Sequence, residues 1–123
     1  MDKLELFGKE FIEQLRDVSI EEYLAIKNGE MKSEDAKQVF QSYSLMDKSS
    51  QVLADKIILN IIDRVLHNTL WMFERSNDFT ICEKKFVDPE NDVVEMSDGL
   101  AGELYSDEGW IEKFSSHPPS TGG

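Results

Sequence analysis

The sequence predicts an α+β fold, and three observations support this prediction. Apolar residues recur at helical spacing through the first two-thirds of the 123-residue chain. After Asn77 the pattern changes to short stretches of β-branched and aromatic residues that flank a turn cluster. A short helical pattern then closes the chain. The predicted architecture is four N-terminal helices, including one long central helix, followed by a β-hairpin and a short C-terminal helix.

Two amphipathic helices are predicted before residue 30. The first covers residues 3–16, where apolar residues recur every three or four positions: Leu4, Phe7, Phe11, Ile12 and Leu15. Ser19, with Glu22 three residues later, is typical of a capping box, so a second helix is expected to begin there. Asn28-Gly29 predicts its end, because both residues tolerate the left-handed conformation that closes many helices.

The third and fourth helices follow at once. Ser33 predicts an N-cap, and the acids after it suit the positive end of the helix dipole; this third helix ends near Met46. The fourth, residues 50–75, keeps a helical period for some seven turns through its apolar residues: Val52, Leu53, Ile57, Ile61, Ile62, Val65, Leu66, Leu70 and Phe73. Further apolar residues lie beyond this stripe, so the helix is expected to be central and covered on more than one side.

The last third of the chain predicts the β segment and one more helix. Residues 79–82 and 85–87 are rich in strand-forming types, residues 88–92 form a turn cluster, and residues 93–96 resume an extended pattern. The last helix is expected over residues 107–114, with Ser106 as its cap. A mostly helical bundle that carries the hairpin as an addition is the alternative architecture.

Length and composition indicate one soluble domain. Residues 1–117 are expected to form a single globular domain and residues 118–123 a flexible tail. The long apolar stretches are interrupted by Asp63, Arg64 and His67, so none reaches the roughly 20 apolar residues of a membrane span. The N-terminus lacks the features of a secretion signal, and the single cysteine, Cys82, cannot make an internal disulfide. We therefore expect a cytoplasmic protein.

The charge balance excludes some partners. The chain has 25 acidic and 13 basic residues and a formal net charge of −12. Such a chain repels phosphate backbones and anionic lipid, so neither nucleic acid nor a membrane is an expected partner. The charge is uneven, because residues 78–123 hold 11 of the acids and only 3 of the bases.

Polar residues of the long helix suggest a possible pocket, but no known catalytic or metal motif is complete. Asp63 and His67 are four residues apart and share one helix face, and Glu74 lies further along the same helix. A second histidine four residues after His67 would be needed for a zinc-protease motif, and Trp71 occupies that position. A calcium loop starting at Asp88 would need glycine at the position of Val93. We therefore expect no cofactor, no metal and no catalytic residue.

A single-sign surface is the feature that points to function. From Asp88 to Glu112 the chain contains nine acids and no lysine or arginine. Such a patch attracts a basic partner and raises its association rate. The residues predicted to bind a partner are Asp88, Glu90, Asp92, Glu95, Asp98, Leu100, Glu103, Tyr105, Asp107 and Glu108. Alternatively the apolar ones pack inward and the acids only keep the protein soluble; Trp110, with Ile111 and Phe114 on the same helix side, favours the core.

In its gross profile the chain resembles the immunity proteins with which bacteria neutralise their own toxins, many of which are basic nucleases. That resemblance rests on small size, acidity and the absence of a catalytic signature. It implies an inhibitor that meets a basic active-site cleft with its acidic C-terminal surface and blocks access. Reversing charge at Asp98, Glu103 and Asp107 would then weaken binding.

Two other classes remain open. One is a small enzyme or ligand-binding domain with a pocket between the long helix and the hairpin, where Asp63, His67 and Glu74 would supply the polar groups. The other is a structural or regulatory subunit that forms homodimers or larger oligomers through the broad apolar stripe of residues 52–73.

Overall fold

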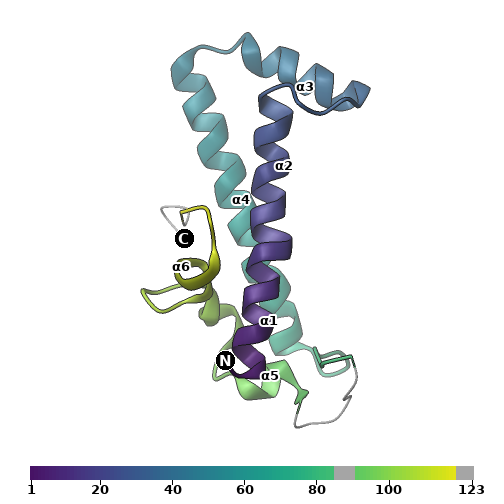
Figure 1. Ribbon diagram of the computed structural model, residues 1–123, viewed down its shortest axis with the longest axis vertical. Helices are drawn as coiled ribbons and strands as arrows, with labels where there is room; N and C mark the ends of the chain where they lie inside the picture. Colours follow the sequence, from purple (N-terminus) through teal and green to yellow (C-terminus); the bar gives the residue numbers. More distant parts are fainter. Residues whose placement is uncertain (85–90, 119–123) are drawn as a thin grey trace.

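The computed structural model describes residues 1–84 and 91–118. Two long helical rods run side by side in opposite directions, with α3 across one end (Figure 1). The first rod joins three elements without a break, namely α1 (Lys3–Phe11), the π-helical turn η1 (Ile12–Arg16) and α2 (Asp17–Lys27). α3 (Glu34–Ser44) then leads to the second rod, α4 (Lys48–Arg75), whose 28 residues span about 42 Å.

One side of the first rod is buried from Gly8 to Ile20, across both junctions between its three elements. Ile12, Arg16 and Ile20 follow one another at intervals of four and are at most 4% exposed. The capping box at Ser19 is not used, and the two helices predicted over residues 3–28 form one rod instead. Asp2 begins the rod, because its carboxylate accepts a hydrogen bond from the Glu5 N–H at 2.8 Å.

The predicted stop at Asn28-Gly29 and the predicted cap at Ser33 are confirmed. α2 ends at Lys27, and Gly29 has φ +77°, a left-handed conformation that glycine adopts without strain. The Ser33 hydroxyl accepts a hydrogen bond from the Ala36 N–H at 3.1 Å and begins α3. The local sequence therefore sets these boundaries.

The predicted β-hairpin is wrong, and with it the α+β class, because the molecule is mainly helical. The part of the chain that the structure describes contains one isolated antiparallel bridge, between Cys82 and Asp92, and no sheet. Val93–Met96, expected as a strand, is the short helix α5. Residues 85–87, expected in the first strand, lie outside the described residues. The reason is a capping interaction: the Asp92 carboxylate accepts hydrogen bonds from the N–H groups of Val94 and Glu95, which turns the chain into a helix.

The C-terminal segment adds two short helical elements. η3 (Leu100–Leu104) is a 3-10 helix that the sequence pattern did not indicate, and α6 (Trp110–Phe114) starts three residues later than predicted. Gly109, rather than Ser106, is the residue before α6. A Cβ atom at Gly109 would lie 2.1 Å from the carbonyl oxygen of Tyr105, so only glycine fits in this tight turn.

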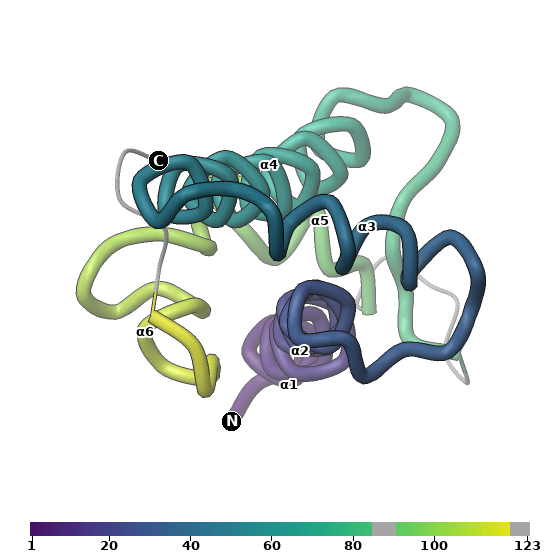
Figure 2. The backbone as a smooth tube through the Cα atoms, turned by 90° about the horizontal axis from the view of Figure 1, so that it is seen from above, coloured from purple at the N-terminus to yellow at the C-terminus, as the bar shows by residue number. Residues whose placement is uncertain are grey.

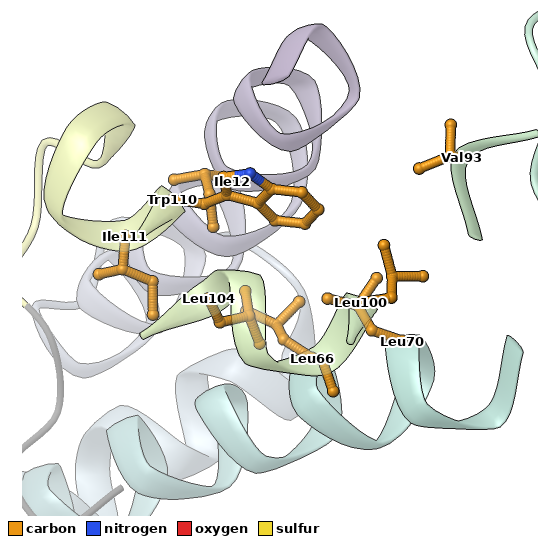
Figure 3. Packing of buried hydrophobic residues seen from close by; sticks show 9 residues of the cluster. Ile12, Leu66, Leu70, Val93, Leu100, Leu104, Trp110 and Ile111 are labelled. Carbon is orange, nitrogen blue, oxygen red and sulfur yellow. The ribbon is translucent and has the colours of Figure 1, made fainter. Parts of the chain in front are cut away.

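The hydrophobic core lies at one end of the molecule, between the first rod, the C-terminal half of α4 and the segment from α5 to α6. Figure 3 shows Trp110 against Ile12, and Leu100 and Leu104 of η3 close to Leu70 and Leu66 of α4. Viewed along the rods, α6 and the chain leading to it lie on one side of the rod pair (Figure 2). The other half of the molecule, where α2, α3 and the N-terminal half of α4 meet, buries few apolar residues, Ile20 and Ala36 among them.

Candidate functional site

α4 buries one side of its circumference and exposes the other. Its buried residues, Asp63, Leu66 and Leu70, lie toward the rest of the fold. Eight of its large apolar residues are between 38% and 58% exposed: Val52, Leu53, Ile57, Ile58, Ile61, Val65, Trp71 and Met72. The expectation that this helix is covered on more than one side is therefore not met by the described residues of a single chain.

Six of these residues form a strip on the outward side, which we call the α4 face: Leu53, Ile57, Ile58, Ile61, Val65 and Met72. The strip extends about 29 Å along the helix axis. Four of its residues and the adjoining, exposed Asn68 are separated by three and four residues in alternation: Ile58, Ile61, Val65, Asn68 and Met72. This seven-residue repeat is the spacing of helices that pack against each other along a seam.

The α4 face carries no carboxylate, although the chain is strongly acidic. The acids of α4 are Asp55, Asp63 and Glu74, and each of them bonds to another part of the protein. The charged residues next to the face are Arg64 and Arg75, both exposed. The outward side of α4 is therefore apolar with a basic margin.

A polar cluster fixes the position of the N-terminal half of α4. The Asp55 carboxylate accepts hydrogen bonds from the hydroxyls of Tyr23 and Tyr43 and from Lys27, whose Nζ lies 2.9 Å away. Burial and, after it, the hydrogen bond to Asp55 raise the pKa of Tyr23, so its hydroxyl stays protonated. Burial by itself raises the pKa of Asp55, but the three donors outweigh it and hold that pKa below its ordinary value. The cluster joins α2, α3 and α4.

A second network ties the C-terminal segment to both rods. Arg16, 1% exposed, donates to the Asp63 carboxylate at 2.7 Å and 3.2 Å, to the Ser115 hydroxyl at 2.9 Å and to the Pro118 carbonyl at 3.0 Å. The Ser115 hydroxyl donates in turn to Asp17 at 2.6 Å. Sequence reasoning missed Arg16. The available signal was its position four residues after Ile12 and four before Ile20, in register with the buried side.

Two of the three residues predicted for a polar pocket hold the fold together. Asp63 is 2% exposed and belongs to the Arg16 network. Glu74 lies at the surface, where its carboxylate accepts a hydrogen bond from the Ala101 N–H at the start of η3, at 3.1 Å. The pocket was expected beside a hairpin, and the described chain forms none. These two carboxylates are therefore already engaged by the protein's own donors.

His67, the third residue, packs against Tyr105 with ring centroids 6.0 Å apart. Burial and, after it, the charge of Asp63 raise the pKa of Tyr105. The Nδ1 of His67 and the hydroxyl of Tyr105 are buried atoms without a hydrogen-bond partner among the described residues. Searched over the same residues, the structure has no cluster of three or more His, Cys, Asp or Glu side chains suited to a metal ion.

The residues predicted to bind a basic partner divide into three groups. Asp88 and Glu90 lie outside the described residues. Glu95, Asp98, Asp107 and Glu108 are exposed. The other four are partly or wholly engaged within the fold, and they are Asp92, Leu100, Glu103 and Tyr105. An exposed acidic surface thus remains on α5 and on the loops around η3.

The engaged residues have clear structural roles. Asp92 caps α5 and also accepts a hydrogen bond from the Thr80 hydroxyl at 2.6 Å. Glu103 accepts one from the Ser97 hydroxyl at 3.0 Å. Leu100 is fully buried in the core and Tyr105 is half-buried. Neither apolar residue offers a free anchor at the surface.

A groove of about 670 Å³ lies between α1 and the segment around Ile81 and Val93. Both charge signs line it. Two of its lysines already form ion pairs, Lys3 with Glu83 at 3.0 Å and Lys9 with Glu13 at 2.8 Å. This lining favours neither an anionic nor a cationic ligand, and the α4 face is the stronger candidate for a functional surface.

Among the described helices, none has the length and apolar character needed to cross a lipid bilayer. Comparison with known proteins found no matching family model, no matching curated protein and no matching solved structure. Any functional conclusion must therefore come from the surfaces of this chain.

Proposed function

We propose that the protein is a binding module that docks another polypeptide onto the α4 face. The observation that supports this is an apolar strip on the outward side of a helix whose inward side already holds the core. Six side chains that are each about half exposed present on the order of 600 Å² of apolar surface, the upper end of what monomeric proteins expose in one patch.

The energetics are consistent with a docking role. Covering about 600 Å² of apolar surface contributes on the order of 15 kcal/mol at ~25 cal/mol per Å². Association itself costs about 4–15 kcal/mol in lost translational and rotational freedom. The two magnitudes are comparable, so burial of the α4 face, together with the partner's own apolar surface, offsets the cost of association.

A photoreactive amino acid at position 61, introduced in the organism that produces the protein, tests this proposal. Ile61 lies in the middle of the face, and we expect it to yield a covalent adduct with a polypeptide of defined mass, identified by mass spectrometry. The matched control is Gln41, an exposed polar residue of α3. The absence of any protein adduct at position 61, or equal adducts at both positions, counts against a docking role.

A second role, carried by a different surface, is one that we also propose: inhibition of a basic protein toxin in the cytoplasm of a bacterium. The exposed acids Glu95, Asp98, Asp107 and Glu108 support it, because the stretch that carries them, residues 91–112, contains no lysine or arginine; the exposed Lys113 that follows pairs with Glu5. The single cysteine is consistent with a reducing compartment. In this role the acidic surface would meet the basic cleft of the toxin and block access to it.

Charge reversal tests the inhibitor role. Glu103 is bonded to Ser97, so its reversal would also disturb the fold; Asp98, Asp107 and Glu108 are the better triple. Their replacement by lysine should weaken binding to a toxin recovered with the wild-type protein by at least about 10-fold and reduce its salt dependence. Lysine at three exposed acids elsewhere, Glu10, Glu22 and Glu30, makes the same change in net charge. Equal effects of the two triples would exclude a specific acidic surface.

A further inference from the structure

We propose that the α4 face docks a second copy of this chain, so that the protein is a homodimer joined along its two α4 helices. This inference rests on the docking role proposed above and names the partner. Area, charge and the seven-residue repeat of the face support it independently.

The area of the face suits a dimer. A standard protein interface buries about 800 Å² on each partner. The apolar side chains of the α4 face supply on the order of 600 Å² of this, and Arg64, Asn68 and Trp71 adjoin them at exposed positions that would supply much of the rest. Two copies related by a two-fold axis bury the same face on each, so one strip serves both sides of the interface.

The charge of the face also favours a second copy. Each chain carries a net charge of −12, so two copies repel each other over most of their surfaces. The α4 face has no carboxylate, and its margin carries Arg64 and Arg75. It is therefore a place where two such molecules can approach without bringing acids together.

The position of Asn68 in the seven-residue repeat favours a parallel arrangement of the two helices. In a parallel pair each residue of the seam faces its own copy, so the amide of Asn68 meets another amide and apolar residues meet apolar residues. In the antiparallel pair with the same spacing, Asn68 would face Ile58 of the second copy. A buried amide without a polar partner is costly, so the antiparallel pair is disfavoured.

Other occupants are less well supported. Residues 119–123 contain no large apolar side chain, so these five residues offer no group that would fill the strip. A lipid surface is disfavoured by the net charge, because anionic headgroups repel an acidic protein. Either occupant would leave the purified protein monomeric in solution.

Sedimentation equilibrium on the purified full chain, from about 1 to about 100 µM, tests the dimer. For the wild-type chain we expect the mass of a dimer at the upper concentration. Val65→Glu should raise the dissociation constant of the dimer by about 100-fold or more, since two carboxylates would enter an apolar seam. Val39→Glu on α3 is the matched control, because Val39 is 46% exposed and Val65 57%. Both substitutions are at exposed helical positions, and circular dichroism checks that each variant folds.

A wild-type chain that remains monomeric at about 100 µM would overturn the dimer. A Val65→Glu variant that dimerises as well as the wild type would also overturn it. So would an equal loss of dimer formation in Val65→Glu and Val39→Glu. The docking role fails separately. A monomer that still gives a position-61 adduct with a different protein retains the role and excludes the second copy, whereas a monomer without any adduct excludes both.

The parallel arrangement has its own test. Ile61→Cys should form an intermolecular disulfide under mild oxidation, because residue 61 faces its copy in a parallel seam. The wild-type chain, which keeps Cys82, controls for cross-linking through the natural thiol. A disulfide that appears only in the Ile61→Cys, Val65→Cys double variant would show the antiparallel arrangement instead.

Discussion

Arg16 connects three parts of the chain that are far apart in sequence. Its guanidinium pairs with Asp63 of α4 and donates to the C-terminal segment at Ser115 and Pro118. A guanidinium taken out of water must find partners for its donors, and here the protein supplies them. A buried ion pair adds little net stability, so the main effect of this network is to fix the position of the C-terminal segment. Breaking the pair is nevertheless costly, because one buried charge is then left uncompensated.

Asp63→Ala should lower the free energy of unfolding by about 3–5 kcal/mol, because Arg16 would remain buried without its carboxylate. Urea titration followed by circular dichroism measures this change. Replacing both members, Arg16→Met with Asp63→Leu, should recover part of the loss, because no buried charge then remains. A loss below about 1 kcal/mol for Asp63→Ala would show that water solvates Arg16 after all.

Gly8 is the second residue with a specific structural role, because Trp110 packs directly on its backbone. A Cβ atom at this position would lie 2.3 Å from the indole ring. Gly8→Ala gains up to about 1 kcal/mol of helix propensity, yet we expect a net loss of about 1–3 kcal/mol because the ring must move. Gly102→Ala in η3 meets no atom within 4 Å and should change stability little. Equal behaviour of the two variants in thermal unfolding would contradict this account.

At this scale the sequence predicted some roles and missed others. The core position of Trp110 was foreseeable because Ile111 and Phe114 share its side of a helical pattern. The burial of Arg16 was not, because a charged residue in an amphipathic helix is usually solvated and its partners come from distant segments. Gly8 had no signal, since only the packed tryptophan explains it.

At the scale of elements, the long periodic helices were predictable and the short segments were not. In α4 the apolar residues recur at helical spacing over 28 residues, so many positions independently indicate a helix. Residues 93–96 have high strand propensity, but that propensity depends on a neighbouring strand, and the Asp92 cap directs them into a helical turn instead. The acidic docking residues were chosen by charge alone, which does not distinguish Asp98 at the surface from Asp92 at a cap.

The Asp55 carboxylate joins α2, α3 and α4, and the strength of its interactions should vary with pH. Three donors lower the pKa of Asp55 in the folded chain, so the unfolded chain takes up this proton more readily. The stabilisation is therefore complete above an unfolded pKa of about 3.9 and is lost as the pH falls through the lower folded value. Asp55→Asn should give a shallower loss of stability between pH 5 and pH 2, measured by urea titration.

Asp98→Asn is the control for this experiment, because Asp98 is an exposed carboxylate in a loop. Its replacement removes one charge without touching the cluster. If the free energy of unfolding of Asp55→Asn falls as steeply as that of the wild type between pH 5 and pH 2, the three donors do not stabilise the ionised carboxylate.

At the scale of the whole molecule, stability is unevenly distributed. The end that contains η3 and α6 holds the buried cluster around Ile12, Leu66 and Trp110. At the other end the rods meet mainly through the Asp55 cluster, and exposed apolar residues such as Leu53 and Ile57 outnumber buried ones. The α4 face extends across both ends, so a second copy would stabilise the weaker end most.

Hydrogen exchange measured by mass spectrometry should reveal this difference. In dilute solution, amides of residues 66–73 should exchange more slowly than those of residues 52–58, because opening the core end requires exposure of more buried apolar surface. Raising the protein concentration should then increase protection of residues 52–58, since dimer formation covers this half of the α4 face. Residues 3–11 of the first rod lie away from the proposed seam and serve as the control. Uniform protection along α4 at low concentration would contradict the unequal distribution, and protection independent of concentration would contradict the dimer.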